Sequence, residues 1–160
     1  MKSSSLNKIK TLDELQKLIH LWRFHSDTIV FTNGCFDLLH KGHITYLEES
    51  SMLGNRLVVA INSDQSVKSL KGESRPIQSE NDRALIIAAL QSVDAVIIFN
   101  ESTPLQLIEK INPDVLVKGG DYSPENVVGK EWVEKNGGKV KIIPFIEGYS
   151  STGLINKIQP

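Results

Sequence analysis

The sequence of 160 residues has no long hydrophobic run, a single cysteine and no excess of charge of either sign. A helix that spans a bilayer needs about 20 consecutive apolar residues, and the polar start MKSSSLNKIK also lacks the apolar core of a secretory signal. Cys35 alone cannot form an internal disulfide, which fits a reducing compartment. The formal net charge of -1 gives no general attraction to a nucleic-acid backbone. We therefore expect a cytoplasmic protein that binds neither membrane nor nucleic acid and that binds phosphate only at a local site.

What is present is ordinary globular composition, with 40% hydrophobic and 23% charged residues, and a length that suits one domain. Short apolar runs that are typical of buried strands occur at 29–31, 57–61, 95–99, 115–117 and 140–143. Segments with helical signals separate these runs. The alternation predicts an α/β fold, a Rossmann-like doubly wound sheet of five parallel strands in a single domain.

The helix signals are local. Thr11 and Glu14 form a capping box before an apolar stripe that ends at Trp22. We expect residues 1–27 to form a loose tail and a leading amphipathic helix, and residues 28–158 to form the main domain. Further helices are expected from about 41 to Gly54, briefly after Ser63, from Ser79, from Thr103-Pro104, from Ser123-Pro124 to Gly137, and after Ser150-Ser151-Thr152.

Polar and glycine-containing loops follow the predicted strands at 33–43, 62–75, 118–123 and 147–152. The carboxyl ends of parallel strands meet at one edge of a sheet, where ligands bind. The four loops should therefore converge on one site. Lys68, Lys71 and Arg75 would make the second of these loops basic and flexible.

The first loop carries His40, Gly42 and His43 at a predicted helix start, where free backbone N–H groups favour anions. Each imidazole can donate an N–H to a phosphoryl oxygen as its charge grows. A helix N-terminus lowers a histidine pKa, so hydrogen-bond donation is the expected role. The alternatives are a structural pair, or a zinc site for which Cys35 and Asp37 are the nearby ligands.

The run Gly34-Cys35-Phe36-Asp37-Leu38-Leu39-His40-Lys41-Gly42-His43 resembles the His-x-Gly-His signature of the cytidylyltransferase-like nucleotidyltransferases. The resemblance covers about 28–158 and continues through Asn62-Ser63-Asp64, Arg75-Pro76, Asp82-Arg83 and Tyr149-Ser150-Ser151-Thr152. Within the family, Val117-Lys118-Gly119-Gly120-Asp121-Tyr122 is most similar to the heptose 1-phosphate adenylyltransferases.

The resemblance implies roles for individual residues. His40, His43 and Lys71 would act in catalysis, with Lys68 as the rival of Lys71 for the leaving pyrophosphate. Arg83 would reach the nucleotide phosphates, although a surface ion pair with Glu80 or Asp82 is the alternative. The remaining residues expected at the nucleotide are Gly34, Phe36, Asp37, Gly42, Asn62, Lys118, Gly120, Asp121, Ser150, Ser151 and Thr152. No protein ligand set for a metal can be assigned.

The same resemblance implies that ATP and D-glycero-β-D-manno-heptose 1-phosphate react to give ADP-heptose and pyrophosphate. Mg²⁺ is expected to arrive with ATP. A homodimer is implied, and so are a separate sugar kinase and phosphatase that supply the substrate.

Two alternatives remain: an enzyme that uses CTP and an alcohol phosphate such as glycerol 3-phosphate, and a non-catalytic nucleotide-binding module. Phe145 and Tyr122 stand where glycerol-3-phosphate cytidylyltransferases carry arginine and tryptophan, which favours the heptose branch. Tyr149-Ser150-Ser151-Thr152 differs from the usual Cys-Ser-Thr-Thr of that branch in its first and third residues.

Overall fold

A computed structural model describes residues 4–120, 123–146 and 148–158 of the chain. Five strands form one sheet: β1 (Ile29–Gly34), β2 (Arg56–Asn62), β3 (Ala95–Phe99), β4 (Val115–Gly119) and β5 (Lys139–Ile143). Their order is β3-β2-β1-β4-β5, and every neighbouring pair is parallel. The predicted five-stranded parallel sheet is therefore confirmed.

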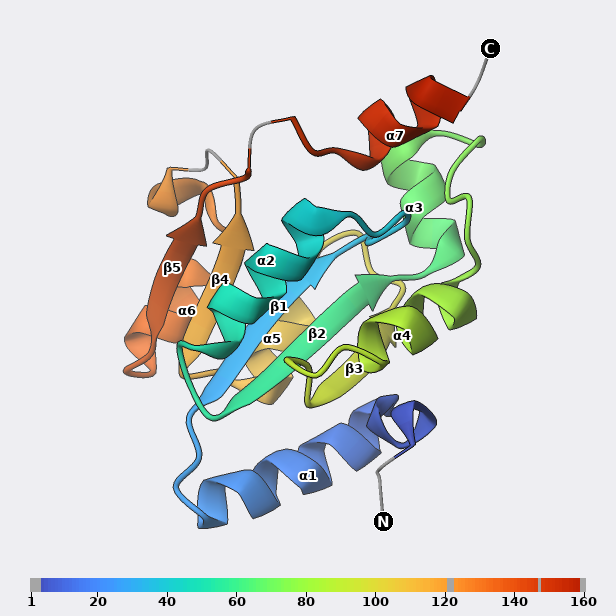
Figure 1. The fold of residues 1–160 in the computed structure, drawn as a ribbon. Helices are drawn as coiled ribbons and strands as arrows, with labels where there is room; N and C mark the ends of the chain where they lie inside the picture. The colour runs from blue at the N-terminus through green and yellow to red at the C-terminus, as the bar shows by residue number, and fades with distance from the viewer. Residues whose placement is uncertain (1–3, 121–122, 147, 159–160) are drawn as a thin grey trace.

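Helices cover both faces of the sheet (Figure 1). They are α1 (Leu12–Phe24), α2 (Lys41–Ser51), α3 (Asp64–Lys71), α4 (Glu80–Ala88), α5 (Leu105–Ile111), α6 (Lys130–Lys135) and α7 (Ser151–Ile158), with short 3-10 turns η1 (Ser5–Lys8) and η2 (Pro124–Asn126). One apolar cluster joins α1, α5 and α6 to the sheet, and a second joins α2 and α4 to the opposite face. This two-sided burial is the doubly wound arrangement that the alternating pattern predicts.

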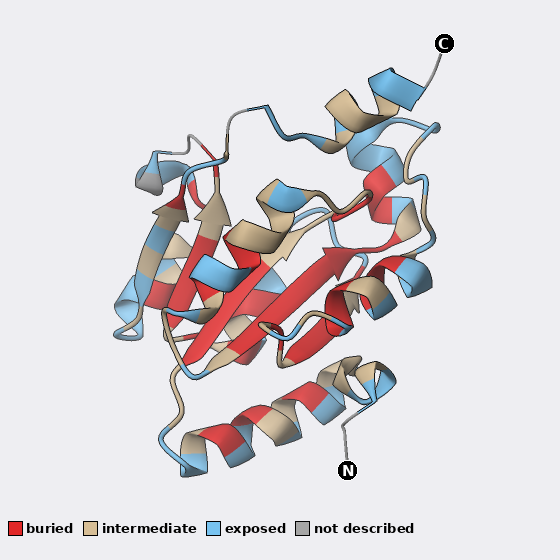
Figure 2. Cartoon of the chain, in the orientation of Figure 1, coloured by how far each residue is buried: buried red, intermediate tan, exposed pale blue. Residues whose placement is uncertain are grey.

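The central strands owe their position to near-complete burial (Figure 2), whereas in the edge strand β5 only Ile143 is buried. In β2, every residue from Leu57 to Asn62 is buried, as a parallel strand covered on both faces requires. The β-branched and aliphatic residues of the central strands alternate between the two clusters, so Phe31 packs with α1 and α5 while Val30 packs with α2 and α4. The sheet is thus a rigid frame that fixes where its carboxyl ends lie.

Helix α1 begins as its sequence predicts. The Thr11 hydroxyl accepts a hydrogen bond from the Glu14 backbone N–H, and the Glu14 carboxylate accepts one from the Thr11 backbone N–H, which completes the capping box. Leu15, Ile19 and Trp22 are its buried residues. The amphipathic helix is confirmed.

The prediction of a loose tail is wrong for residues 5–10. Residues 5–8 form η1, the Lys10 backbone N–H donates to the Val96 carbonyl at 2.8 Å, and Lys8 Nζ donates to the Leu90 carbonyl at 3.0 Å. These partners lie more than 80 residues away in the sequence, so local composition could not reveal them.

Two other segments differ from their prediction. Lys68 and Lys71 lie in α3, not in a loop, because Ser63 caps the helix and its turns extend to Gly72, which has a φ of 96°. The helix expected from Ser123 to Gly137 is two pieces, η2 and α6. Gly129, at a φ of 89°, separates them.

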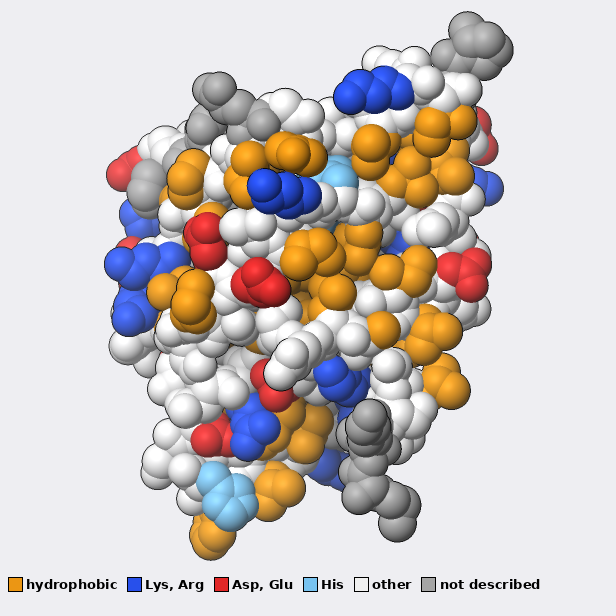
Figure 3. Space-filling model, viewed as in Figure 1, with side chains coloured by type: hydrophobic (Ala, Val, Ile, Leu, Met, Phe, Trp, Pro, Cys, Tyr) orange, Lys and Arg blue, Asp and Glu red, His pale blue; other side chains and the backbone are white. Residues whose placement is uncertain are grey.

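Charged side chains of both signs are interspersed over the face seen in Figure 3, with hydrophobic side chains between them. In the part of the chain that the structure describes, no helix is both long enough and apolar enough to cross a bilayer.

Candidate active site

A cavity of about 570 Å³ lies beyond the carboxyl ends of the strands. Residues at or after the carboxyl ends of all five strands line it, together with the start of α2 and the end of α3. The predicted convergence of these loops is confirmed. Strand β1 pairs with β2 on one side and with β4 on the other. The chain connections therefore run in opposite directions on the two sides of β1, and the cavity lies at this point. Ligands usually bind at this position in such sheets.

His40 and His43 stack against each other inside this cavity. Their ring centroids are 3.9 Å apart and the rings are inclined by 23°. His40 is the residue that precedes α2, and His43 lies in its first turn. The Nδ1 atoms of both rings are buried and have no hydrogen-bond partner within the described residues. A buried polar atom without a partner carries a free-energy cost, which a bound ligand would relieve.

Gly42 leaves the space that the histidine pair needs. A Cβ atom at this position would lie 3.0 Å from Cε1 and Nδ1 of His40 and 3.3 Å from Cβ of Tyr149. Any larger residue would push the His40 ring or the Tyr149 segment away. The spacing His-x-Gly-His therefore has a steric reason in the structure.

The pKa of each histidine is lowered, which favours the neutral imidazole at pH 7. Burial is the first cause of the shift that brings the pKa of His43 to about 4; the charge of Lys71 and a charge on His40 act in the same direction, and the Leu38 carbonyl opposes it. Burial also lowers the pKa of His40. The predicted direction was correct, but burial is the main cause instead of the helix terminus. A neutral imidazole has one N–H donor and one acceptor nitrogen.

Lys71 lines the cavity at the end of α3. Its charge is near enough to act on the pKa of His43. Lys68 lies almost one turn earlier on the same helix and does not line the cavity. Between the two rival lysines, the structure places Lys71 at the site.

Ser150, Ser151 and Thr152 line the cavity from the start of α7. Ser150 Oγ accepts a hydrogen bond from the Gly153 backbone N–H at 2.9 Å, and Ser151 Oγ donates to the Leu38 carbonyl at 3.0 Å. The second bond ties the start of α7 to the loop that carries His40. Tyr149, which replaces the usual cysteine, packs near His40 with ring centroids 6.3 Å apart, and the Lys41 ammonium lies 5.8 Å from the Tyr149 ring.

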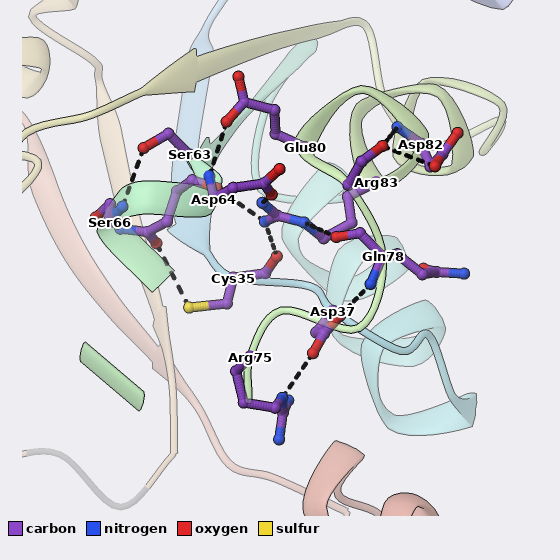
Figure 4. A network of polar contacts seen from close by, with 12 residues as sticks. Cys35, Asp37, Ser63, Asp64, Ser66, Arg75, Gln78, Glu80, Asp82 and Arg83 are labelled. Carbon is purple, nitrogen blue, oxygen red and sulfur yellow. Dashed lines mark hydrogen bonds and ion pairs between the residues drawn. The ribbon is translucent and has the colours of Figure 1, made fainter. Parts of the chain in front are cut away.

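Asp37 lines the cavity but is engaged with the protein. It is 1% exposed, and it accepts hydrogen bonds from Arg75 Nε at 2.7 Å, from the Ile77 backbone N–H at 2.8 Å and from the Gln78 backbone N–H at 3.0 Å (Figure 4). Burial alone would raise its pKa, but the backbone N–H groups of Gln78 and Ile77 and the Arg75 guanidinium outweigh burial and lower it. Asp37 therefore shapes the site loop, and its contact with the nucleotide stays a prediction.

Arg83 also differs from its prediction. Its side chain is fully buried, donates to three backbone carbonyls and pairs with Asp64 at 2.8 Å. It neither lines the cavity nor pairs with Glu80 or Asp82. The surface ion pair is therefore wrong, because the side chain is buried and pairs with Asp64 instead. The phosphate contact stays a prediction, and in the structure the guanidinium is engaged by partners from distant loops.

The other predicted residues divide into three groups. Gly34, Phe36, Asn62 and Lys118 line the cavity, Gly120 does not, and Asp121 lies outside the described residues. Burial lowers the pKa of Lys118, and the Cys35 thiol partly offsets this.

Several residues of the cavity wall lie outside the loops that the sequence analysis predicted: Tyr46, Ser102, Thr103, Pro104, Val128, Phe145 and Ile146. Phe145 lies over the glycines that end β4, since a Cβ at Gly119 or Gly120 would be 2.8 Å from its ring. Its position two residues after β5 was a usable signal. Tyr46 is on the buried side of α2, and burial raises its pKa to about 12. Nothing in its helical spacing separates it from a core residue.

The zinc alternative has no third ligand. Among the described residues no group of three or more histidine, cysteine or acidic side chains could hold a metal ion. Cys35 instead points its Sγ toward the Asn62 side-chain oxygen at 3.8 Å.

A doubly wound sheet with a cavity of about 570 Å³ at its strand ends, and with two stacked histidines at a helix start, fits the site of a nucleotidyltransferase. The model of the cytidylyltransferase-like family matches residues 31–156. The chain belongs to that family and is a nucleotidyltransferase.

Curated relatives with high identity carry the name bifunctional protein HldE. The protein from Koribacter versatilis is 59% identical over 150 residues, which are 94% of this chain and 31% of that protein. The protein from Geotalea uraniireducens is 54% identical over 152 residues, again 31% of its length. The chain therefore spans about a third of the length of these relatives.

Solved structures give the same fold. The lipopolysaccharide core biosynthesis protein from Thermoplasma volcanium is 31% identical, with a TM-score of 0.61, over 78% of this chain and 99% of that one. A pantoate-beta-alanine ligase from Francisella tularensis has a TM-score of 0.60 at 16% identity, over 94% of this chain and 77% of that one. The second likeness shows the fold alone.

Proposed function

We propose that the chain transfers the adenylyl group of ATP to D-glycero-β-D-manno-heptose 1-phosphate, which yields ADP-heptose and pyrophosphate. The stacked pair His40 and His43 in the strand-end cavity carries the proposal. The heptose branch is supported by the similarity of residues 117–122 to heptose adenylyltransferases. It is also supported by the relation to a protein that is described as acting in lipopolysaccharide core biosynthesis.

In this proposal a phosphate oxygen of the sugar attacks the α-phosphorus in line with the departing pyrophosphate. The new P–O bond forms as the bond to the β-phosphate bridging oxygen breaks, and that oxygen keeps the electron pair. No covalent intermediate with the enzyme is needed. Rate acceleration then comes from positioning and from charge stabilisation.

Each residue of the site has a matching task. His40 and His43 donate N–H groups to oxygens of the reacting phosphate, where charge grows in the transition state. Their lowered pKa values favour neutral imidazoles in the free site, and the negative phosphates would favour protonation once bound. Lys71 and the hydroxyls of Ser150 and Thr152, which line the same cavity, would bind the leaving pyrophosphate.

Mg²⁺ enters the proposal as the partner of ATP. The polar lining of the cavity offers imidazole, ammonium, amide and hydroxyl groups, and its carboxylate, Asp37, is held by Arg75 and two backbone N–H groups. This donor set suits phosphate oxygens and gives no carboxylate cage for a divalent ion. An ion held by the phosphates themselves would supply charge neutralisation when bound.

The proposal is tested by pyrophosphate release in the presence of Mg²⁺, with ATP or CTP offered against heptose 1-phosphate and glycerol 3-phosphate. We expect release with ATP and heptose 1-phosphate. His43→Ala should lower kcat by about 100-fold, the usual loss when one transition-state donor is removed. His20→Ala is the matched control, because His20 is exposed on α1 and should leave kcat unchanged.

Other outcomes have distinct meanings. Release with CTP and glycerol 3-phosphate would move the protein to the second enzyme branch. Release from no pair, together with nucleotide binding, would favour the non-catalytic module. Light scattering of the same sample would test the proposed homodimer, and the separate sugar kinase and phosphatase remain part of the proposal.

A further inference from the structure

Arg83 joins the ends of two neighbouring strands from beneath the cavity. Its Nη1 donates to the Cys35 carbonyl at 2.7 Å, just after β1, and to the Asn62 carbonyl at 2.8 Å, at the end of β2. Its Nε donates to the Gln78 carbonyl at 3.1 Å, and its Nη2 pairs with Asp64 Oδ1 at 2.8 Å. Figure 4 shows the guanidinium among these partners. One side chain therefore connects three separate loops.

The Gln78 peptide connects this arginine to Asp37. The Gln78 carbonyl accepts from Arg83, and the Gln78 backbone N–H donates to Asp37 Oδ1 at 3.0 Å. Asp37 is 1% exposed and Arg83 is 0% exposed. Two buried charges of opposite sign thus hold the backbone N–H and the backbone carbonyl of one residue, Gln78. In a low-dielectric interior such hydrogen bonds are strong, and an unpaired partner is costly.

These contacts fix the segment 64–78 at both ends. At its start, Asp64 binds Arg83 through its carboxylate, and its backbone N–H donates to Glu80 Oε2 at 2.7 Å. At its end, Arg75, Ile77 and Gln78 bind Asp37. Lys71 lies between the two anchored ends, and His40 follows Asp37 by three residues. The same contacts therefore hold the lysine and the histidines of the site relative to one another.

We infer that Arg83 and Asp37 are positioning residues, a clamp that sets the loop carrying His40 and the segment carrying Lys71 in register for adenylyl transfer. The change in kcat that this inference predicts rests on the proposed function. Arg83 itself does not line the cavity, so its effect passes through the backbone of Cys35 and Asn62 and through Gln78. Misplacement of reacting groups by about 1 Å can cost about 100-fold in rate.

The test compares Arg83→Lys with Arg56→Met. Lysine keeps the positive charge but offers one nitrogen in place of the guanidinium fork, so it cannot reach carbonyls of three loops together. Arg56 is a suitable control arginine, since it pairs with Asp27 at 2.7 Å and with Asp94 at 3.5 Å at the opposite end of β2. Asp64→Asn is a milder variant that weakens one contact of Arg83, and it serves if Arg83→Lys does not fold.

Three quantities are measured below the unfolding temperature. They are kcat, the KM for ATP, and the rate of hydrogen exchange of the backbone amides at 34–43 and 72–79. For Arg83→Lys we expect kcat to fall by about 10- to 100-fold and exchange in both segments to accelerate together. The KM for ATP should change by less than about threefold, because the loss falls mainly on the transition state. Arg56→Met should leave kcat and both segments unchanged, although it can lower the unfolding temperature.

Loss of stability in Arg83→Lys with wild-type kcat and wild-type exchange would overturn the inference, because Arg83 would then act on stability alone. Faster exchange confined to one of the two segments would also overturn it. A wild-type protein that releases no pyrophosphate from any substrate pair would contradict the proposed function. In that case coupled exchange at 34–43 and 72–79 would still support the clamp, and unchanged exchange would overturn it.

Discussion

The buried imidazole of His43 can donate a hydrogen bond to phosphate, but its burial makes the stability of the free protein depend on pH. Its pKa in the folded chain is about 4, compared with 6.5 for an ordinary histidine, and burial is the first cause. The unfolded chain therefore binds more protons than the folded chain between these two values. Stability from this group is fully present above pH 6.5 and is lost as the pH falls toward 4. His40 adds an effect of the same sign, and Lys71 faces the pair as a further positive charge.

This pKa shift predicts that the free energy of unfolding rises between pH 4 and pH 6.5. The contribution of His43 is at most about 3 kcal/mol, from about 1.4 kcal/mol for each pKa unit. Urea denaturation at several pH values measures it, and His43→Asn should flatten the profile. His20→Asn is the control at an exposed position. An equal slope in wild type and His43→Asn would contradict the assignment.

At the scale of single elements, α1 depends on its first turn. The Thr11 hydroxyl and the Glu14 carboxylate satisfy each other's backbone N–H groups, and hydrogen bonding from Thr11 lowers the pKa of Glu14. Thr11→Ala should lower the free energy of unfolding by about 1 kcal/mol, measured by urea denaturation. Ser4→Ala is the matched control, because Ser4 precedes η1 without a side-chain capping bond. A loss of the same size in Ser4→Ala would contradict a specific cap.

At the scale of the whole molecule, α1 is part of the central packing. Leu15 is fully buried in the cluster that also contains Phe31 of β1 and Ile108 of α5. Leu15→Ala should lower the free energy of unfolding by about 2–5 kcal/mol, in one cooperative transition followed by tryptophan fluorescence. Leu21→Ala is the control on the same helix, since Leu21 is 53% exposed. Two separate transitions would instead indicate that residues 1–27 unfold independently of 28–158, a division that remains a prediction.

Strand and helix types followed from local patterns because local forces set them. Apolar runs such as Leu57–Ile61 have one favourable position, a strand buried on both faces. The Thr11 box and the Ser63 and Ser79 caps are contacts within three residues. The main site loops could be predicted because parallel strands deliver their carboxyl ends to one edge.

The residues whose contacts the sequence analysis did not predict have distant partners. Arg83 bonds to Cys35 and Asn62, which are 48 and 21 residues away, and Asp37 bonds to residues about 40 positions later. Residues 8–10 dock on the chain near Leu90 and Val96. A side chain with charge suits either a ligand or a buried partner, and its own neighbours in the sequence do not distinguish the two.

The alternation of strands and helices, the sheet class and the histidine pair at a helix start follow from local sequence, because propensity, periodicity and capping act over a few residues. Which charged groups face the cavity and which lie beneath it depends on tertiary contacts. Lys71 and Asp37 line the cavity wall, whereas Arg83 is fully buried and does not. The position of each charged group depends on where three loops meet in space. Burial of a charge is unfavourable unless partners from all of those loops are in place.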